Sequence, residues 1–316
     1  MARIAVVPSH PPFTDGGHLT IARALVTALR AAGHEADLVT TPQNRFGRQA
    51  AAYLATWLTD VGESDGRRID QVISLRFPAY AVRHPRHVCW LLHPMREYYD
   101  LWPSWRARLS AANRIKEGLR RRLIHAADRR LLAPGRVRLF AISRTVAGRL
   151  RAALDLEAEP LLPPPPPRAY RQEPPGEEFF LASRLTPLKR VDLILRALAT
   201  PDGAALRLAV AGEGDASTML RALAGELGVA SRVTFLGRVD EATLVQRYAR
   251  ARAVVFTPRD EDYGFVTAEA FASARAVVTC SDSGGATELV RDGENGFVVA
   301  PDPAAIARAM RLLADT

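Results

Sequence analysis

The spacing of apolar residues predicts that the chain opens with a parallel α/β unit. A short run rich in β-branched residues, Arg3–Pro8, predicts the first strand. A turn-forming stretch, Ser9–Gly17, follows, and apolar residues then recur at helical spacing until Gly33. Ala36–Thr40 predicts the second strand. Because a strand, a helix and a strand follow one another, we expect a parallel sheet.

The first half ends at a proline run. Before it, three apolar runs predict further buried strands, with a long arginine-rich helical stretch before the last: Gln71–Leu75, His87–Leu92 and Arg138–Ser143. Five consecutive prolines, 163–167, favour a stiff polyproline II connector that donates no backbone hydrogen bonds. We therefore predict an N-terminal Rossmann-like domain at 1–162, a linker at 163–168 and a second Rossmann-like domain at 169–316.

After the linker, strands and helices alternate again. The predicted strands are Phe179–Ala182, Leu206–Ala211, Val233–Leu236, Ala253–Thr257, Ala276–Thr279 and Gly296–Val299. The predicted helices are Val191–Ala199, Ser217–Leu227, Glu241–Ala251, Val266–Ala274, Thr287–Arg291 and Ala304–Leu313. The fold class is thus α/β, with two doubly wound parallel sheets. Ligands of such sheets bind at the carboxyl ends of the strands, so we expect a cleft between the two domains.

Composition narrows the class of protein. The 316 residues are 48% hydrophobic and 24% charged, which is typical of globular domains and excludes disordered, collagen-like and coiled-coil chains. No window offers the roughly 18 uncharged apolar residues that a membrane span needs. Cys89 and Cys280 are the only cysteines, too few for a disulfide framework or a zinc cluster. These features predict a cytoplasmic protein.

The positive charge is concentrated in one segment. The net charge is +9, yet residues 106–151 carry fourteen basic side chains against two acidic ones, so the rest of the chain sums to −3. This unevenness argues against a nucleic-acid partner. The basic residues surround Leu109, Ile115 and Leu119, and Trp102 and Trp105 precede them. The pattern fits a basic amphipathic helix on an anionic membrane, or a solvated arginine-rich face as GC-rich genomes encode.

Glycines and cations mark two candidate anion-binding positions. Gly16 and Gly17 lie between the first strand and helix, where backbone amides and a helix N-terminus favour an anion, although an ordinary glycine turn has the same pattern. No GxGxxG motif follows a strand, which argues against a dinucleotide cofactor. Arg184 and Lys189 lie in the loop after a second-domain strand and suit a diphosphate. Lys189 is notable because 41 of the 43 basic residues are arginine.

An acidic loop gives the strongest signal. A buried strand ends at Thr257, and Glu261 follows in the acidic loop, with Glu269 on the next helix. Carboxylates at these places can accept hydrogen bonds from the hydroxyls of a ribose or a pyranose. Two glutamates at this spacing alone are more often surface charge, but the neighbouring glycine loops favour a binding site.

These motifs, taken in order, resemble a known family. The chain contains PPFTDGG, CWLLHP and FAISRTVAGRL before the linker, and SRLTPLKRVDLILRAL, LAVAGEGD, RVTFLGRVDEATL, DEDYGFVTAEAF and SDSGGATELVRDGENGFVV after it. The series resembles the retaining glycosyltransferases of family GT4, which have the GT-B fold, and looks like a bacterial subgroup of them.

The resemblance implies a role for each matching residue. Arg184 and Lys189 would hold the donor diphosphate, Glu261 the donor-sugar hydroxyls and Glu269 the ribose, while His93 would face the sugar near the reaction centre. Gly16 and Gly17 would approach the phosphates, and Gly237, Arg238 and Val239 would lie against the base. The other implied donor-binding positions are Gly212, Tyr263, Gly264 and Phe265. By itself, His93 is more often a packed or hydrogen-bonded histidine.

The implied activity is transfer of a hexose from a UDP- or GDP-sugar, with retention, to a hydroxyl acceptor that is a glycan, a lipid-linked molecule or a small molecule. No cofactor or metal is implied, because cationic side chains and helix N-termini would stabilise the leaving diphosphate. Two alternatives stay open: a nucleotide-sugar epimerase of the same fold and a non-catalytic nucleotide-sugar-binding module. A lipid-linked acceptor would place the protein peripherally at the inner face of the membrane, with contact through residues 106–151.

The chain departs from the family pattern in two places. Ala274 and Ala276 stand where the family usually has a glycine and a proline, a change that we expect the turn to tolerate. Related chains usually continue with helices that cross back onto the first domain. Here we expect that crossover to be short or absent.

Overall fold

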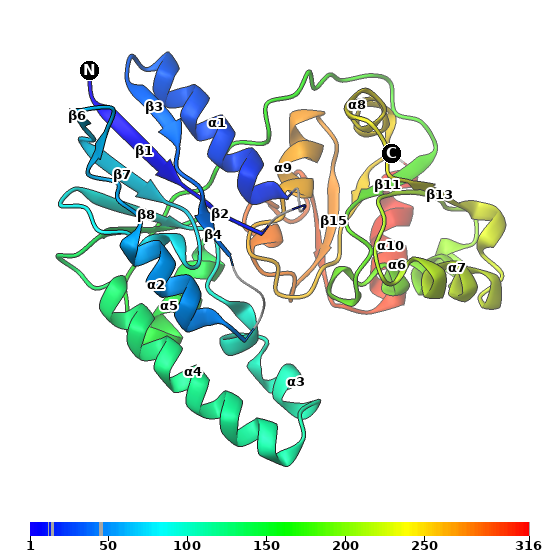
Figure 1. Ribbon diagram of the computed structural model, residues 1–316. Helices are drawn as coiled ribbons and strands as arrows, with labels where there is room; N and C mark the ends of the chain where they lie inside the picture. The colour runs from blue at the N-terminus through cyan, green and yellow to red at the C-terminus, as the bar shows by residue number, and fades with distance from the viewer. Residues whose placement is uncertain (12, 14–15, 44–46, 316) are drawn as a thin grey trace. The chain divides into compact units, whose positions relative to one another are not determined.

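The computed structural model describes residues 1–11, 13, 16–43 and 47–315 (Figure 1). The chain divides into two compact units, Met1–Pro163 and Pro164–Thr316. The division falls inside the run of prolines. The turn-forming stretch predicted at Ser9–Gly17 includes Pro12, Thr14 and Asp15, which lie outside the described residues.

The first unit is built on a six-stranded parallel sheet in the order β10-β9-β8-β7-β1-β3. Its strands are β1 (Arg3–Val7), β3 (Glu35–Leu38), β7 (Gln71–Ser74), β8 (His87–Leu91), β9 (Arg138–Ala141) and β10 (Glu159–Pro160). Two small additions flank the sheet: β2 (Ser9–His10) with β4 (Thr41–Pro42), and β5 (Glu63–Ser64) with β6 (Arg67–Arg68). The strand order reverses between β1 and β7, so the prediction of a doubly wound parallel sheet is confirmed here.

Helices cover both faces of this sheet. They are α1 (Gly17–Ala31), α2 (Gln49–Leu58), α3 (Trp102–Ala107), α4 (Ala111–Leu131) and α5 (Arg144–Leu154), with short 3-10 turns η1 (Ala79–Ala81) and η2 (Arg96–Tyr98). Figure 1 shows α2, α4 and α5 on the side of the sheet opposite to α1. Helix α2 was not predicted, because its N-cap, Arg48, makes no side-chain capping bond and four of its ten residues are alanine.

The arginine-rich stretch forms two helices, and Leu109 lies in the break between them. Ser110 begins α4 by accepting a hydrogen bond from the backbone N–H of Asn113. Trp102 and Trp105 pack against the ring of Tyr98 and are only partly exposed. The basic stretch is thus not one continuous helix, and its predicted contact with an anionic membrane stays a prediction.

A buried carboxylate fastens α4 to the first unit. Asp128 on α4 is 1% exposed and accepts hydrogen bonds from the hydroxyls of Tyr53, Tyr80 and Tyr99. The Tyr80 and Tyr99 oxygens each lie 2.6 Å from the carboxylate. Burial raises the pKa of Asp128, and the three hydroxyl donors act in the opposite direction. The carboxylate thus joins α4 to α2, to η1 and to the residue after η2.

The second unit has a six-stranded parallel sheet in the order β13-β12-β11-β14-β15-β16. Its strands are β11 (Glu178–Ala182), β12 (Arg207–Ala211), β13 (Val233–Gly237), β14 (Val254–Val255), β15 (Val277–Cys280) and β16 (Gly296–Val299). Its helices are α6 (Val191–Leu198), α7 (Ser217–Glu226), α8 (Glu241–Arg250), α9 (Phe265–Ala272) and α10 (Pro303–Ala314). The 3-10 turns are η3 (Pro187–Lys189), η4 (Pro201–Gly203), η5 (Ala230–Arg232) and η6 (Gly285–Thr287).

The predicted alternation of this half is confirmed, with one exception. The helix expected at Thr287–Arg291 is wrong, because a single 3-10 turn forms earlier, at Gly285–Thr287. Gly284 has φ +60° and lets the chain turn there, and the Thr287 hydroxyl donates to the Gly284 carbonyl at 2.8 Å. The core of the sheet includes Phe179, Phe180 and Leu181, which are at most 1% exposed. No helix in the described part of the chain is long and apolar enough to span a bilayer.

Candidate functional site

The candidate site of the second unit lies where its strand order reverses. β11 and β14 are neighbours, paired at Phe180 and Val254, although β12 and β13 come between them in the chain. Arg184 and Lys189 follow β11, and Glu261 follows β14. Because the sheet is parallel, the loops after the two strands leave it at the same edge. Open α/β sheets bind their ligands at this switch point.

Lys189 and Glu261 form an ion pair at this edge. The Lys189 Nζ donates to Glu261 Oε2 at 2.5 Å, and each side chain is about one-fifth exposed. The same Nζ lies 5.4 Å from the centre of the Phe256 ring. Arg184 is exposed, and no carboxylate among the described residues pairs with its guanidinium. The structure therefore presents one paired cation and one solvent-facing cation.

Arg190 holds the two loops in place. Its Nη1 and Nη2 donate to the two carboxylate oxygens of Asp282 at 2.7 and 2.6 Å. Its Nε and Nη2 also donate to the carbonyls of Thr257 and Pro258, each at 2.8 Å. The hydrogen bonds from Arg190 lower the pKa of Asp282. This fork fixes the end of β14 against η3, so it sets the positions of Glu261 and Lys189 without belonging to the pair.

Glycines allow the backbone of these loops to pack closely. Gly212 has φ +125°, and a Cβ on it would lie 1.9 Å from the Ser183 carbonyl oxygen. Its N–H donates to the Gly237 carbonyl at 2.7 Å, which joins the loop after β12 to the end of β13. Gly264 has φ +83° at the start of α9, with Ala286 3.0 Å from the position of a Cβ. No other residue type fits either position without movement.

Glu269 lies in a separate network on α9. It is 6% exposed. Tyr248 donates to its Oε2 at 3.0 Å, Tyr170 to its Oε1 at 3.2 Å, and Arg168 forms an ion pair with Oε1. The structure thus brings Lys189 and Glu261 together but holds Glu269 with residues that follow the proline run.

The other predicted donor-binding residues lie in the same loops. Arg238 and Val239 follow β13, with Arg238 exposed and Val239 partly buried. Tyr263 is 4% exposed, and burial, followed by the charge of Glu288, raises its pKa to about 12. Its ring meets the ring of Phe265 edge-on at 5.1 Å.

The remaining predicted residues belong to the first unit. Gly16 is the N-cap of α1, with extended backbone, and Gly17 is the first residue of that helix. His93 follows β8 and is partly buried, with Nδ1 2.7 Å from the Pro94 carbonyl oxygen. A proton on Nδ1 makes that bond and fixes the tautomer. Among the described residues, no group of three His, Cys, Asp or Glu side chains could hold a metal ion.

Comparison with known families decides the class of protein. Residues 168–316 match the model of the family described as "Glycosyl transferases group 1". Residues 168–316 belong to this family. The second half of the chain is therefore a group 1 glycosyltransferase domain, and the resemblance to family GT4 is confirmed for it. Among proteins of curated function, none matches the chain in sequence.

Solved glycosyltransferases share the fold of the whole chain. WaaG, a glycosyltransferase involved in lipopolysaccharide biosynthesis, is 19% identical, with 99% of this chain and 90% of WaaG covered and a TM-score of 0.71. Sucrose-phosphate synthase from Thermosynechococcus elongatus is 19% identical, with 100% and 90% covered and a TM-score of 0.74. Anabaena HepE in complex with UDP and glucose is 19% identical, with 98% and 89% covered and a TM-score of 0.65. The GT-B fold is thus confirmed.

The structure of this glycosyltransferase adds residues that sequence reasoning missed. Arg168 and Tyr170 meet Glu269 from about a hundred positions earlier in the chain, and Tyr248 meets it from α8. Gly285 donates its N–H to the Glu261 carbonyl at 2.8 Å and so supports the acidic loop. The only sequence signal for these residues was the position of Arg168 directly after the prolines and the paired glycines at 284 and 285.

Proposed function

We propose that this enzyme transfers a hexose from a nucleotide-diphosphate sugar to a hydroxyl acceptor with retention at the anomeric carbon. The observation that carries the proposal is the Lys189–Glu261 pair at the switch point of the second unit, with Arg184 in the same loop as Lys189. A cation and a carboxylate 2.5 Å apart can each exchange the other for a group of the donor: Lys189 for a phosphate oxygen, and Glu261 for a sugar hydroxyl.

Arg184 and Lys189 hold the diphosphate. When the sugar–phosphate bond breaks, negative charge grows on the departing diphosphate, and cations placed beside it lower the barrier. This role needs no metal ion, so we propose a metal-independent reaction. The exposed Arg184 makes the first contact, and Lys189 follows once it leaves Glu261.

Glu269 binds the ribose. Its Oε1 is held by Arg168 and Tyr170, whereas Tyr248 holds Oε2. A ribose hydroxyl donates to Oε1 in place of one of these donors, while Tyr248 keeps the carboxylate in position. Gly212, Gly237, Arg238 and Val239 approach the nucleotide, as do Tyr263, Gly264 and Phe265 at the start of α9.

Retention follows from attack on the face that the leaving group vacates. We assign no protein nucleophile, so in this proposal the incoming hydroxyl attacks that face directly and gives its proton to the departing phosphate. His93 faces the sugar, and Gly16 and Gly17 approach the phosphates from the first unit, which also binds the acceptor. Uridine nucleotides are the donors that we test first, because HepE has been solved with UDP and with UDP-glucose.

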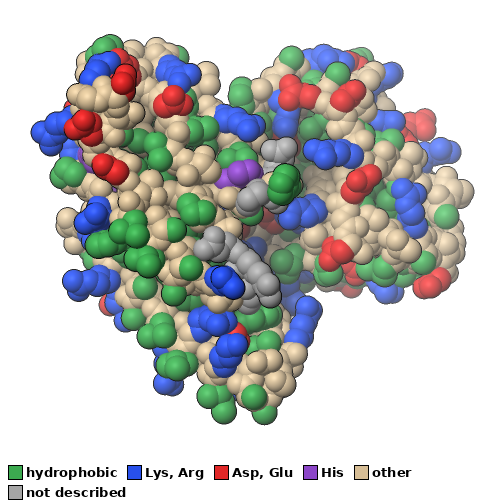
Figure 2. Space-filling view, in the orientation of Figure 1, with side chains coloured by type: hydrophobic (Ala, Val, Ile, Leu, Met, Phe, Trp, Pro, Cys, Tyr) green, Lys and Arg blue, Asp and Glu red, His purple; other side chains and the backbone are tan. Residues whose placement is uncertain are grey.

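We also propose that the protein is cytoplasmic and lies peripherally at the inner face of the membrane. The support comes from α4, where Ile115, Leu119 and Leu123 are 60–78% exposed between cationic side chains. Figure 2 shows hydrophobic side chains interleaved with Lys and Arg over this part of the first unit. Such a helix suits an anionic surface that presents a lipid-linked acceptor.

Incubation with UDP-glucose and GDP-mannose, with and without an extract of acceptors, tests the reaction. The proposal predicts nucleotide release that depends on the acceptor and an α-linked product from an α-linked donor. Isomerisation of the donor would instead support an epimerase, and binding without turnover would support a binding module. Lys116→Ala is a matched control for Lys189→Ala in donor binding, because these are the two lysines of the chain.

A further inference from the structure

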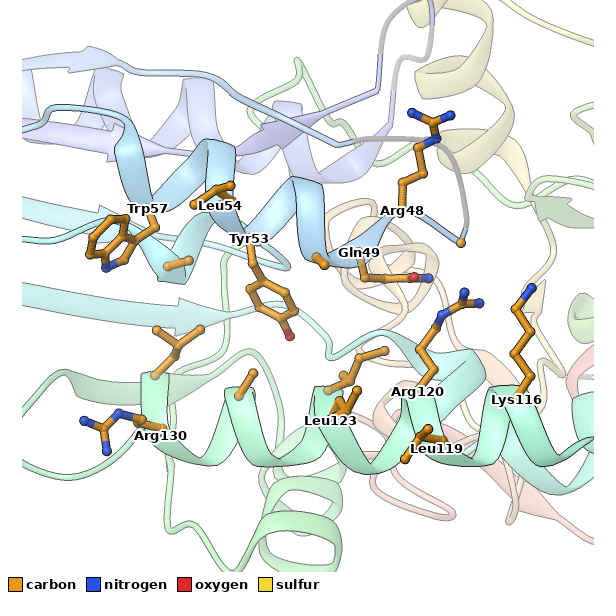
Figure 3. A pocket seen from close by; sticks show the side chains of 16 residues that line it. Arg48, Gln49, Tyr53, Leu54, Trp57, Lys116, Leu119, Arg120, Leu123 and Arg130 are labelled. Atoms are coloured by element: carbon orange, nitrogen blue, oxygen red, sulfur yellow. The ribbon is translucent and has the colours of Figure 1, made fainter.

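Two helices of the first unit, α2 and α4, leave an apolar groove between them (Figure 3). The groove has a volume of about 690 Å³, within the range of ligand pockets. Leu54 and Trp57 line it from α2, and Leu119 and Leu123 line it from α4. Figure 3 shows Tyr53 projecting from α2 toward α4 across the groove. The lining is therefore hydrocarbon along most of its length.

The apolar side chains of this groove are exposed to water. Leu54, Leu119 and Leu123 are 56–64% exposed, and Trp57 is 40% exposed. Together with Leu58 and Ile115, they make six of the eleven large hydrophobic side chains that are exposed in the described part of the chain. An apolar patch of this kind on a folded domain marks a binding surface.

One end of the groove is cationic. Figure 3 shows Arg48, Lys116 and Arg120 gathered at one end, with Trp57 and Arg130 at the other. Arg120 pairs with Glu117 of its own helix, whereas no carboxylate among the described residues pairs with Arg48 or Lys116. The described residues that line the groove include no acidic side chain. The groove therefore offers an anion site joined to an apolar channel.

We propose that this groove binds one anionic lipid of the membrane leaflet, with its phosphate between Arg48 and Lys116 and its hydrocarbon chain along Leu119 and Leu123. From Lys116 to Arg130, α4 extends about 20 Å, which accommodates a long acyl chain. A second copy of this chain is a poor occupant, because a two-fold contact would bring two strongly basic surfaces together. This inference goes beyond sugar transfer, since lipid binding requires no donor.

Three soluble probes separate the head from the chain: lysophosphatidylglycerol, lysophosphatidylcholine with the same acyl chain, and glycerol 3-phosphate. Titration calorimetry below the micelle concentration measures each. Lysophosphatidylglycerol is expected to bind at least tenfold more tightly than lysophosphatidylcholine, and glycerol 3-phosphate to bind more weakly than either. Equal affinity of the two lipids, or binding of glycerol 3-phosphate alone, would overturn the proposal.

Two variants on α4 test where the acyl chain of the lipid binds. Leu123→Ser removes a wall of the groove and is expected to weaken lysophosphatidylglycerol binding about tenfold. Ile115→Ser is the matched control, because Ile115 is 78% exposed on α4 but does not line this groove. Equal losses in both variants would show general adsorption rather than a groove. A dimer that Leu123→Ser dissociates would show that a second copy occupies the groove.

The charged end has its own test. Lys116→Ala is expected to weaken lysophosphatidylglycerol about fivefold and to leave lysophosphatidylcholine unchanged. Affinity for nucleotide diphosphates should be the same in Leu123→Ser, Lys116→Ala and the wild type. Failure of the lipid proposal is thus distinguishable from failure of donor binding, on which the proposed transfer reaction depends.

Discussion

The two units share an architecture but use their charges differently. In the second unit, cations and carboxylates meet in pairs near the carboxyl ends of the strands: Lys189 with Glu261, Arg190 with Asp282, and Arg168 with Glu269. In the first unit, the buried carboxylate of Asp128 is bound by three tyrosine hydroxyls and no cation. Among the cations of α4, Arg120 pairs with Glu117 of the same helix, whereas Lys116 has no acidic partner among the described residues.

The difference separates two kinds of recognition. A paired cation and carboxylate at a strand end can exchange each other for a ligand that carries both a phosphate and hydroxyls, so the second unit suits a nucleotide sugar. Unpaired cations beside exposed leucines suit an amphiphile. The neutral donors around Asp128 fasten the helix that presents them.

The largest expected effect belongs to Lys189. Lys189→Ala removes a charged donor from the departing diphosphate and should raise the barrier by about 3 kcal/mol, about a hundredfold in turnover. Steady-state kinetics, with an acceptor that supports nucleotide release in the incubation proposed above, measures the loss of turnover. Lys116→Ala should keep donor KM unchanged. If turnover is unchanged in Lys189→Ala, the paired cation at the strand end does not act on the donor, and the two units do not differ in the way described.

The two buried carboxylates can be compared through their tyrosines. Tyr80→Phe removes a 2.6 Å hydrogen bond to Asp128 and should lower the free energy of unfolding by about 2 kcal/mol. Tyr248→Phe should cost about 1 kcal/mol, because Glu269 keeps Arg168 as a charged donor. Urea unfolding measures both. If Tyr248→Phe lost more unfolding free energy than Tyr80→Phe, the account in which Asp128 depends on its neutral tyrosine donors would be contradicted.

Acid should weaken the first unit through His87. This side chain is 6% exposed, and its Nε2 lies 2.8 Å from the Ser74 hydroxyl. Burial, and then the charges of Arg136 and His84, lower its pKa to about 4. Between pH 6.5 and 4 the unfolded chain binds a proton that the folded chain does not, so stability falls as the pH falls, by about 2 kcal/mol at pH 5.

His87→Gln isolates this contribution. The variant cannot take up the proton, so its loss of stability between pH 7 and pH 5 should be smaller than that of the wild type. Unfolding free energies of both proteins at the two pH values give the comparison. Identical losses would mean that other groups set the acid sensitivity.

The smallest effect concerns the turn after α9. Ala274 has φ +54°, a left-handed conformation that costs a residue with a Cβ. Ala274→Gly should raise the free energy of unfolding by about 1 kcal/mol, because glycine adopts this conformation without strain. Ala272→Gly, at the last residue of α9, is the control, and it should lower the free energy of unfolding because glycine is unfavourable in a helix. The expectation that the turn tolerates alanine stays a prediction until this measurement.

The sequence predicted the second unit better than the first. In the second unit, each apolar run is followed by a loop whose glycines and charged residues mark its end, so the strands and the switch-point loops could be read directly. In the first unit, α2 carries no capping residue and was missed, and with it the groove that it forms with α4. Such a groove depends on two helices distant in the chain, which periodicity within one segment does not reveal.

The candidate site was predicted as positions rather than as contacts. Spacing placed Glu261 in a loop and Glu269 on the helix after it. It could not show that Glu261 contacts Lys189 while Glu269 contacts Arg168 and Tyr170. Those contacts join residues 72 and about a hundred positions apart. They follow from the order of the strands in the sheet, which the sequence pattern does not specify.

The most direct test of the central claim, that Lys189 leaves Glu261 to bind the donor diphosphate, is a calorimetric titration of UDP, GDP and the matching monophosphates. For the base that binds, the diphosphate should exceed the monophosphate in affinity by more than tenfold in the wild type and in Lys116→Ala. In Lys189→Ala the gap should shrink to a few-fold, because the charged donor is gone. An unchanged gap in Lys189→Ala, or no binding of either diphosphate by the wild type, would contradict the account.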